Sequence, residues 1–256
     1  MSEKDVRTAT AKRDVAFPTV EEIERVIKAM PARTDVETRN RALVAFALIT
    51  AARNAALTSF KVRHVDLACG FVDQDARDVK TKNSKTFRTY FVPISELATT
   101  VVEHWIRFRI ENGASGDAPL FPATRTAVGA DQRFEVIGLS VDHWRTTSAV
   151  RSIFRAAFER AGLPYSHPHT FRKTLVAFAE RTCQGPEQFK AFSQNIGHDS
   201  PMATFSAYGA VKVSRQGEII RELGRQAVPS SDSDLADEIA ERLVRRLSSN
   251  GILRCR

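Results

Sequence analysis

Residues 166–174 read Ser-His-Pro-His-Thr-Phe-Arg-Lys-Thr, which brings His167, His169 and Arg172 together in one short stretch. Two closely spaced histidines are typical of a metal site. Only Cys183 stands near them as a further ligand type at suitable spacing, which argues against a metal. A second interpretation makes His169 a hydrogen-bonded core residue and Arg172 part of a solvated helix face. The third makes both residues part of a catalytic centre, and the rest of the chain decides among the three.

The composition is that of a folded, basic protein. The 256 residues are 43% hydrophobic, enough for one large domain or for one domain with appendages. Lysine and arginine number 38 against 30 acidic residues, giving a formal net charge of +8. This excess favours a polyanionic partner such as DNA or RNA, although a solvated basic face would also produce it.

Cysteine usage and the apolar runs limit the class of protein. Cys69, Cys183 and Cys255 are widely spaced and odd in number, which fits neither a disulfide framework nor a zinc site and predicts free thiols. No apolar run is long enough to cross a membrane, and residues 1–15 lack the apolar core of a secretory signal. The sequence therefore predicts a cytoplasmic protein, associated with the nucleoid if it is bacterial, with no membrane partner.

Helical periodicity dominates the chain. Thr19 and Glu22 form a capping-box pattern that opens a helix closed by Pro31. Residues 41–52 are apolar on nearly every side, which predicts a helix buried inside the domain. Ser95 caps a further helix that stops at Asn112-Gly113. Later helices are predicted from Ser140 to Gly162 and over residues 171–181, 186–195, 202–211 and 214–226.

A region between residues 65 and 94 has the pattern of short strands instead. Strands are predicted over residues 65–67, 70–72, 75–80 and 87–94. The polar stretch Lys82–Lys85 is the expected hairpin turn between the last two. A loop rich in Gly, Ala, Asp and Pro is expected from residue 113 to about Gly138. The predicted fold class is mainly α with a small antiparallel β-sheet (α+β).

The two ends of the chain differ from its middle. Residues 1–16 carry four basic side chains and no periodicity, which indicates a basic arm or an interdomain linker. Residues 227–256 contain a Ser/Asp-rich linker and an amphipathic helix over 235–247. The apolar stripe of that helix requires a partner surface. A single domain is predicted between them, over residues 17–226.

Five segments of this domain occur in an order and spacing that resemble the tyrosine recombinase (phage integrase) family. They are Ala52–Leu57, Thr81–Lys85, His169–Arg172, Ile196–His198 and Thr204–Tyr208. A His-x-x-Arg box followed by Ile-Gly-His and then a tyrosine is a specific combination. The resemblance covers residues 17 to about 225 and implies the catalytic-domain fold of that family.

The resemblance also implies the roles of individual residues. Arg53 and Arg172 would clamp the scissile phosphate, and His198 would lie beside it. His169 would handle the proton of the nucleophile, which would be Tyr208. Lys82 in the hairpin would protonate the leaving oxygen, with Lys80 and Lys85 remaining alternatives for this role.

The chemistry suits these residue types. Guanidinium groups can hold the oxygens of a phosphodiester transition state bidentately without a metal. A tyrosine hydroxyl has a reference pKa of about 10, so attack near neutral pH needs a base and positive surroundings. A covalent phosphotyrosine conserves the bond energy, so a DNA hydroxyl can reseal the strand without ATP. No cofactor and no metal are expected.

The predicted function is site-specific recombination of double-stranded DNA attachment sites by a homotetramer. The helix over 235–247 would be exchanged between subunits or remain an independent tail. The family's separate N-terminal DNA-clamping domain is absent from these residues, so residues 1–16 would either end a linker from it or substitute for it. Ala56 stands where the family usually has an acidic residue, which leaves open a catalytically weak DNA-binding module. DNA relaxation of the type IB topoisomerase kind also remains open.

Overall fold

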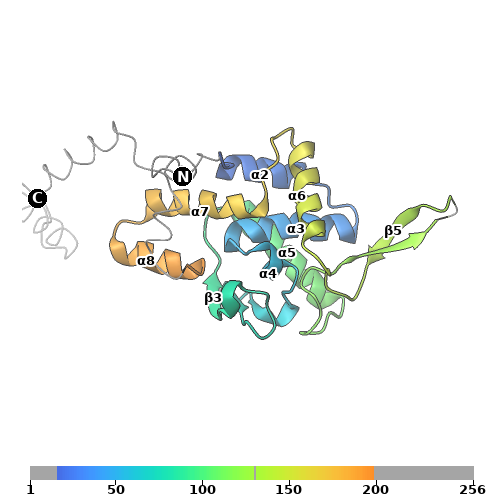
Figure 1. The fold of residues 1–256 in the computed structure, drawn as a ribbon, viewed down its shortest axis with the longest axis horizontal. Coiled ribbons are helices and arrows are strands. Elements are labelled where there is room, and N and C mark those ends of the chain that lie inside the picture. The colour runs from blue at the N-terminus through green and yellow to red at the C-terminus, as the bar shows by residue number, and fades with distance from the viewer. Residues whose placement is uncertain (1–15, 130, 199–256) are drawn as a thin grey trace, which may run out of the picture. The chain divides into compact units, whose positions relative to one another are not determined.

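The computed structural model describes residues 16–129 and 131–198, all within one compact unit (Figure 1). The predicted helices over 202–211, 214–226 and 235–247 lie outside the described residues, as do Tyr208 and Cys255. Cys69 and Cys183 are free cysteines. Within the described part of the chain, no helix has both the length and the apolar character needed to span a membrane.

The fold is helical with two small antiparallel sheets, which confirms the predicted fold class. The helices are α2 (Val20–Ala29), α3 (Asp35–Thr50), α4 (Asn54–Leu57), α5 (Glu96–Glu111), α6 (Ser148–Arg160), α7 (Pro168–Thr182) and α8 (Pro186–Asn195). One sheet contains β1 (Val65–Asp66), β2 (Phe71–Gln74) and β3 (Phe87–Tyr90), and the other contains β4 (Thr124–Val128) and β5 (Phe134–Leu139). Short 3₁₀ turns, η1 and η2, cover Val62–His64 and Lys82–Ser84.

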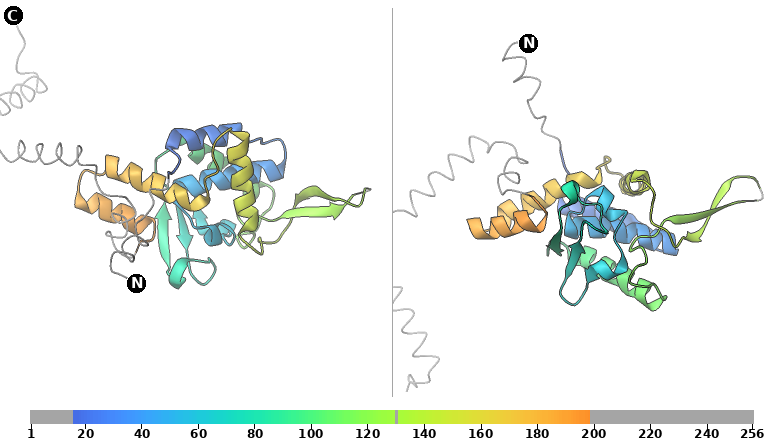
Figure 2. Two further views of the ribbon diagram at one scale, coloured as in Figure 1. Left: turned by 45° about the horizontal axis from the view of Figure 1, so that its top comes forward. Right: turned by 60° about the horizontal axis from the view of Figure 1, so that its bottom comes forward.

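Helix α3 forms the centre of the core and packs against α5 and α7, with α2 and α6 on one side (Figure 2). Every residue from Ala42 to Thr50 is buried, as its continuous apolar sequence predicts. The helix begins at Asp35, earlier than predicted, because Thr34 and Glu37 form a second capping box. Its buried Arg39 donates to the Pro122 carbonyl and to Thr124 Oγ1, which attaches the start of β4 to the core.

The three-stranded sheet has the order β1-β2-β3, with Phe71 paired to Tyr90 and Gln74 to Phe87. The predicted strand over 75–80 is wrong. Asp75 and Asp78 turn the backbone there: the Val79 N–H donates to the Asp75 carbonyl at 2.7 Å, and Asp78 accepts from basic side chains across the connection. Asp75 Oδ1 also accepts from the Arg77 N–H at 2.9 Å, which is the kind of local side-chain bond through which aspartate favours turns.

Two further predictions are wrong in the region after α5. The expected loop up to Gly138 contains the hairpin of β4 and β5, which projects from the helical body (Figures 1 and 2). Both of its faces are largely exposed, with Phe134 at 79%, so the usual alternation of buried and exposed residues is weak. The helix predicted from Ser140 begins only at Ser148, because Ser140 Oγ accepts from the Asp142 N–H and forms a local turn.

The helices after this hairpin agree better with the sequence. Helix α8 has the predicted bounds, and α5 is capped by Ser95 and ends before Asn112 as predicted. Helix α7 begins at Pro168, before the predicted start at Phe171, because proline suits the first helical position. Helix α8 contacts both α7 and β3, so it joins the helical body to the sheet.

Candidate active site

A cavity of about 650 Å³ brings together segments that are far apart in sequence. Its lining contains Arg53, Asn54, Ala55, Lys82, Asn83, Lys85, Phe87, Thr147, His169, Arg172, Gly197 and His198. The structure thus places five of the candidate residues in one cavity, namely Arg53, Lys82, His169, Arg172 and His198. The sixth candidate, Tyr208, lies outside the described residues.

A turn after α3 places Arg53 in the cavity. Ala51 ends the helix in the left-handed conformation with φ of 52°, and Arg53 then precedes the first residue of α4. Thr50 Oγ1 supports this turn by donating to the Phe46 carbonyl at 2.6 Å and accepting from the Ala52 N–H at 3.2 Å. The position of the half-buried Arg53 is therefore determined by this turn.

Arg172 holds two sides of the cavity together. Its side chain is buried and donates from Nη1 to the Ala51 carbonyl and from Nη2 to the Ile196 carbonyl, both at 2.7 Å. Burial, together with a smaller effect of the charge of Arg53, lowers the pKa of Arg172 to about 9. The group remains protonated at neutral pH, so one side chain joins the Arg53 turn, helix α7 and the His198 turn.

His169 lies in the first turn of α7, with Pro168 before it. Its ring stacks on that of His167, with centroids 6.2 Å apart and an interplanar angle of 11°. Burial lowers the pKa of His169 below its usual range, and the charges of Arg172, His167 and Arg53 lower it further. His169 is therefore neutral at neutral pH and able to accept a proton.

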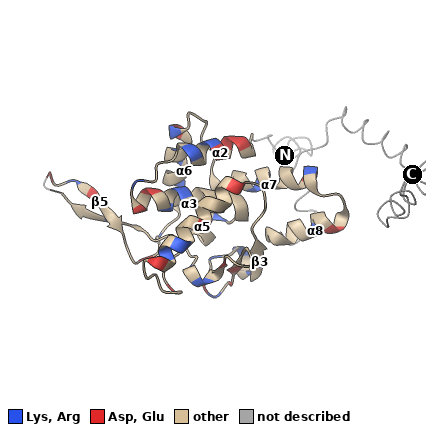
Figure 3. Ribbon diagram, turned by 180° about the vertical axis from the view of Figure 1, so that it is seen from behind, with Lys and Arg blue, Asp and Glu red and all other residues tan. Residues whose placement is uncertain are grey.

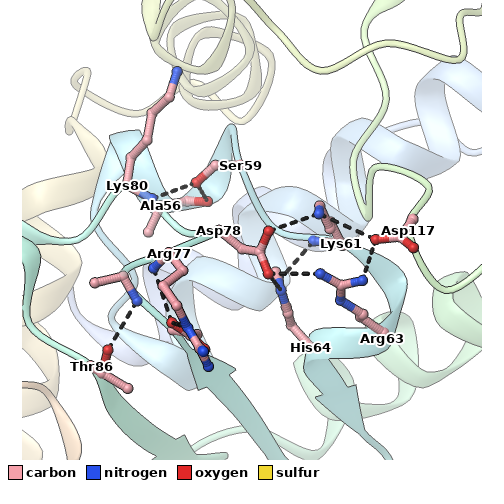
Figure 4. A network of polar contacts seen from close by, with 12 residues as sticks. Ala56, Ser59, Lys61, Arg63, His64, Arg77, Asp78, Lys80, Thr86 and Asp117 are labelled. Carbon is pink, nitrogen blue, oxygen red and sulfur yellow. Dashed lines mark hydrogen bonds and ion pairs between the residues drawn. The ribbon is translucent and has the colours of Figure 1, made fainter.

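The hairpin between β2 and β3 supplies the candidate lysines. Lys82 and Lys85 line the cavity, whereas Lys80 is not among its lining residues. Lys80 instead donates its backbone N–H to Ser59 Oγ at 2.9 Å, and its side chain extends away from the neighbouring polar network (Figure 4). Lys85 Nζ reaches the His198 carbonyl at 3.5 Å. Lys82 is exposed in the η2 turn.

The His198 turn depends on a glycine. Gly197 has φ of +70°, and a Cβ added there would lie 2.5 Å from the Phe87 ring. Backbone bonds from Gly197 N–H to the Gln194 carbonyl and from His198 N–H to the Ser193 carbonyl close the end of α8. Glycine adopts this conformation without strain and leaves room for the Phe87 ring, and the turn brings His198 to the cavity.

Several lining residues were not identified from the sequence. Asn54 follows Arg53 directly, and its Oδ1 is buried with no hydrogen-bond partner among the described residues. Thr147 precedes α6 and was missed because that helix was expected to start earlier. Ala56, at the position of the family's acidic residue, does not line the cavity; it is buried, and its carbonyl accepts from Ser59 Oγ at 3.1 Å. The position of Ser59 in the sequence did not predict its bond to the Ala56 carbonyl.

The cavity is suited to an anion. The described residues that line it include arginines, lysines and histidines but no Asp or Glu. Elsewhere the charges are mixed: from behind, basic and acidic residues both occur on α2, α3 and α5 (Figure 3). Positive groups with N–H donors in a partly enclosed site match a phosphate group. No cluster of three or more potential metal ligands occurs in residues 16–129 and 131–198.

Comparisons with known proteins point to integrases and recombinases. The sequence profile of the phage integrase family matches residues 17–215. The fold is similar to that of XerA recombinase, at 20% identity and a TM-score of 0.54 over 86% of this chain and 67% of that one. It is similar to a lambda integrase dimer bound to a COC' core site, at 16% identity and a TM-score of 0.51 over 80% of this chain and 67% of that one. It is also similar to the Tn1549 transposon integrase in complex with transposon right end DNA, at 13% identity and a TM-score of 0.53 over 88% of this chain and 70% of that one. Among curated protein sequences, none matches this chain significantly.

Proposed function

The chain belongs to the phage integrase family, and we propose that it is a site-specific DNA recombinase that cleaves and rejoins strands through a 3′-phosphotyrosyl intermediate at Tyr208. One observation carries the proposal: Arg53, His169, Arg172 and His198 converge on a cavity whose described lining has no acidic side chain. Such a cavity favours a phosphodiester over a neutral or cationic substrate.

Phosphate binding is the first step. Arg53, Arg172 and His198 would donate hydrogen bonds to the non-bridging oxygens, whose negative charge increases in the transition state. Arg172 is held by two backbone carbonyls, so its guanidinium needs little rearrangement when the phosphate binds. Donors fixed before the reaction stabilise the transition state more than mobile ones.

Strand cleavage requires two proton transfers. His169 would accept the hydroxyl proton of Tyr208 as its oxygen forms a bond to phosphorus, a role that its lowered pKa supports. The bond from phosphorus to the 5′ oxygen breaks, and the ammonium of Lys82 would give that oxygen a proton. Lys82 is proposed over Lys80, which does not line the cavity, and over Lys85, which contacts the His198 carbonyl.

Rejoining is the same reaction in reverse. A 5′ hydroxyl of the same or another DNA strand attacks phosphorus, and the bond to Tyr208 breaks. His169 returns a proton to the tyrosine oxygen, and Lys82 accepts one from the attacking hydroxyl. The number of phosphodiester bonds is unchanged, so neither ATP nor a metal is required.

The proposed partners are double-stranded DNA attachment sites and further copies of the chain. The solved complexes with lambda integrase and Tn1549 integrase contain DNA, and this supports a DNA partner here. A homotetramer is proposed by extension from the family. For the apolar stripe of residues 235–247, an apolar cavity of about 490 Å³ between the end of α7 and the start of α8 is a candidate acceptor on a neighbouring subunit. Residues 1–16 and 227–256 are proposed as appendages of the catalytic domain.

A second candidate function, a catalytically weak DNA-binding module, is favoured by Ala56. A methyl group there cannot make the hydrogen bonds of the acid that the family usually has. Ser59 nevertheless joins this turn to the lysine hairpin, because its Oγ donates to the Ala56 carbonyl and accepts from the Lys80 N–H. We therefore favour the active enzyme.

Covalent trapping tests the proposal. The chain is incubated without metal on nicked DNA substrates carrying candidate attachment sites, and protein–DNA adducts that survive denaturant are counted. We expect an adduct with the wild type and none with Tyr208→Phe. Tyr165→Phe is the matched control, since phenylalanine retains the contact of Tyr165 with the Arg155 guanidinium, 4.6 Å from the ring.

The other outcomes identify the alternatives. An adduct that persists in Tyr208→Phe would contradict the assignment of the nucleophile. DNA binding without any adduct would favour the binding module. Relaxation of a supercoiled plasmid that lacks an attachment site would favour the topoisomerase type of reaction.

A further inference from the structure

Asn195, the last residue of α8, pairs with the outer edge of strand β3. Its Oδ1 accepts from the Tyr90 N–H at 2.7 Å, and its Nδ2 donates to the Tyr90 carbonyl at 2.9 Å. One side-chain amide thus satisfies both backbone groups of a single strand residue, as a neighbouring strand would do. β3 is the outer strand of its sheet, so Asn195 provides its continuation on that side.

Buried bonds reinforce this contact. The backbone carbonyl of Asn195 accepts from Thr89 Oγ1 at 2.8 Å, and Thr89 Oγ1 accepts from Gln74 Nε2 at 2.9 Å. Thr89 and Gln74 are both buried. Strands β2 and β3 and helix α8 are therefore joined in one hydrogen-bonded chain through a single residue of the helix.

The two elements joined by Asn195 lead directly into the candidate active site. After Asn195 come Ile196, whose carbonyl accepts from Arg172, and then His198. Before Tyr90 on β3 comes Phe87, whose ring lies against Gly197, and before that the lysine-bearing turn. Asn195 therefore joins the His198 turn to the strand that carries the lysine hairpin, alongside the contact of Lys85 Nζ with the His198 carbonyl and the packing of Phe87 on Gly197.

The other arm of the hairpin is fixed by different residues. Asp78 accepts from Lys61 Nζ at 2.8 Å and from Arg63 Nη2 at 2.7 Å, and Ser59 accepts from the Lys80 N–H (Figure 4). The η2 turn between the two arms is exposed at Lys82, Asn83 and Ser84. Its own side chains are not packed, so its position depends on the anchoring of both arms.

We propose that Asn195 is a positioning residue for proton transfer to the leaving oxygen, because its bridge to Tyr90 fixes the lysine hairpin relative to His198 and Arg172. The inference rests on the proposed function, in which a hairpin lysine supplies that proton. A displacement of about 1 Å of a catalytic group can reduce a rate by about a hundredfold. Loss of the bridge would leave the proposed phosphate ligands Arg53 and Arg172 in place and displace Lys82.

The test compares two leaving groups. One nicked substrate has the ordinary 5′ oxygen at the scissile bond, and the other has sulfur at that position. A thiolate departs without a proton, so its cleavage does not need the lysine. Single-turnover cleavage of both substrates is measured for the full-length wild type, Asn195→Ala and Lys82→Ala. Gln194→Ala, in the exposed preceding residue of α8, is the matched control.

We expect Asn195→Ala to slow cleavage of the oxygen substrate by about tenfold to a hundredfold and to cleave the sulfur substrate within about threefold of the wild type. Lys82→Ala should show the same selectivity for the oxygen substrate with a larger loss, and Gln194→Ala should cleave both substrates like the wild type. DNA binding should be unchanged in all variants. Asn195→Asp keeps the acceptor for the Tyr90 N–H but places a carboxylate oxygen against the Tyr90 carbonyl, so it tests the same bridge if the alanine variant does not fold.

Three outcomes would overturn the inference. Equal losses on both substrates would indicate a general structural defect, and an unchanged rate on the oxygen substrate would indicate no role. If Lys82→Ala is rescued by sulfur and both Asn195 variants are not, the bridge does not act through the lysine. A wild type that forms no Tyr208 adduct on either substrate is a distinct result, because it contradicts the proposed function itself.

Discussion

The guanidinium of Arg172 donates from Nη2 to the Ile196 carbonyl at 2.7 Å, across 24 residues of sequence. Its Nη1 makes the equivalent bond to the Ala51 carbonyl. Both acceptors are backbone atoms that lie two residues before a candidate phosphate ligand, Arg53 or His198. Arg172 therefore helps determine where two other candidate phosphate ligands lie, in addition to its own proposed contact with phosphate.

This bracing predicts a specific defect in Arg172→Lys. Lysine keeps the positive charge, but a single ammonium cannot reproduce the planar fork that bonds two separate carbonyls. We expect a loss of about 1–3 kcal/mol in unfolding free energy from the carbonyl left without a partner, and at least about a hundredfold slower adduct formation. Arg181→Lys, in an exposed residue of the same helix, should change neither quantity. Wild-type cleavage and stability in Arg172→Lys would contradict the bracing role.

The Gly197 turn predicts a second defect. In Gly197→Ala the residue keeps a left-handed backbone, which costs about 1–2 kcal/mol, and its methyl group overlaps the Phe87 ring. We expect denaturant unfolding to show a loss of at least about 2 kcal/mol and adduct formation to fall sharply as His198 is displaced. Gly185→Ala is the control, because an added Cβ there meets no atom within 4 Å. Its cost at the helix cap should stay below about 1 kcal/mol.

The elements that the sequence predicted well are those whose signals are local. Helix α5 has its Ser95 cap and its Asn112-Gly113 stop, and α8 begins at a proline in the first helical position. Two of the features that it missed depend on residues distant in sequence. The segment around Asp78 does not form the predicted strand, because Asp78 bonds to Lys61 and Arg63. The start of β4 is held by Arg39 on α3.

The candidate site shows the same division. The motifs contain five cavity residues that the structure brings together, because each motif carries its functional side chain within a few residues of a helix end or turn. The groups that hold those motifs against one another were not predictable. Asn195 precedes the Ile-Gly-His motif and would be taken for an ordinary helix end, and its partner Tyr90 looked like an ordinary strand residue.

The lowered pKa of His169 predicts the acid side of the pH–rate profile. Burial and the nearby charges of Arg172, His167 and Arg53 favour the neutral ring, so its folded pKa lies below the usual value of about 6.5. In the proposed mechanism His169 acts as a base when neutral, so the cleavage rate should be flat at pH 7–8 and fall only below about pH 6.5. His169→Gln should be about a hundredfold or more slower and should lack this acid limb.

Linkage gives the matching stability change. Between the lowered folded pKa and about pH 6.5 the unfolded chain binds a proton at His169 that the folded chain does not, so stability decreases as the pH falls through this window. Denaturant titrations of wild type and His169→Gln at several pH values measure the difference. If the fall in cleavage rate at acid pH persists unchanged in His169→Gln, a group other than His169 causes it.

The lysine hairpin predicts a graded response to three alanine substitutions. Lys82→Ala should slow cleavage of an ordinary phosphodiester by about a hundredfold to ten-thousandfold, which is the usual contribution of a general acid. Lys80→Ala should stay within about threefold of the wild type, because its contact with Ser59 uses the backbone N–H and its side chain does not line the cavity. Lys85→Ala should have an intermediate effect, because Lys85 Nζ contacts the His198 carbonyl.

Single-turnover adduct formation on the nicked oxygen substrate separates these cases, and the sulfur substrate identifies the acid. Only the variant that lacks the proton donor should regain wild-type speed when the leaving group is a thiolate. A defect in Lys85→Ala that sulfur does not rescue would fit a supporting contact with the His198 turn. If sulfur rescues Lys85→Ala and Lys82→Ala has no defect, the proton donor is Lys85, and the exposed position of Lys82 in the η2 turn has a different role.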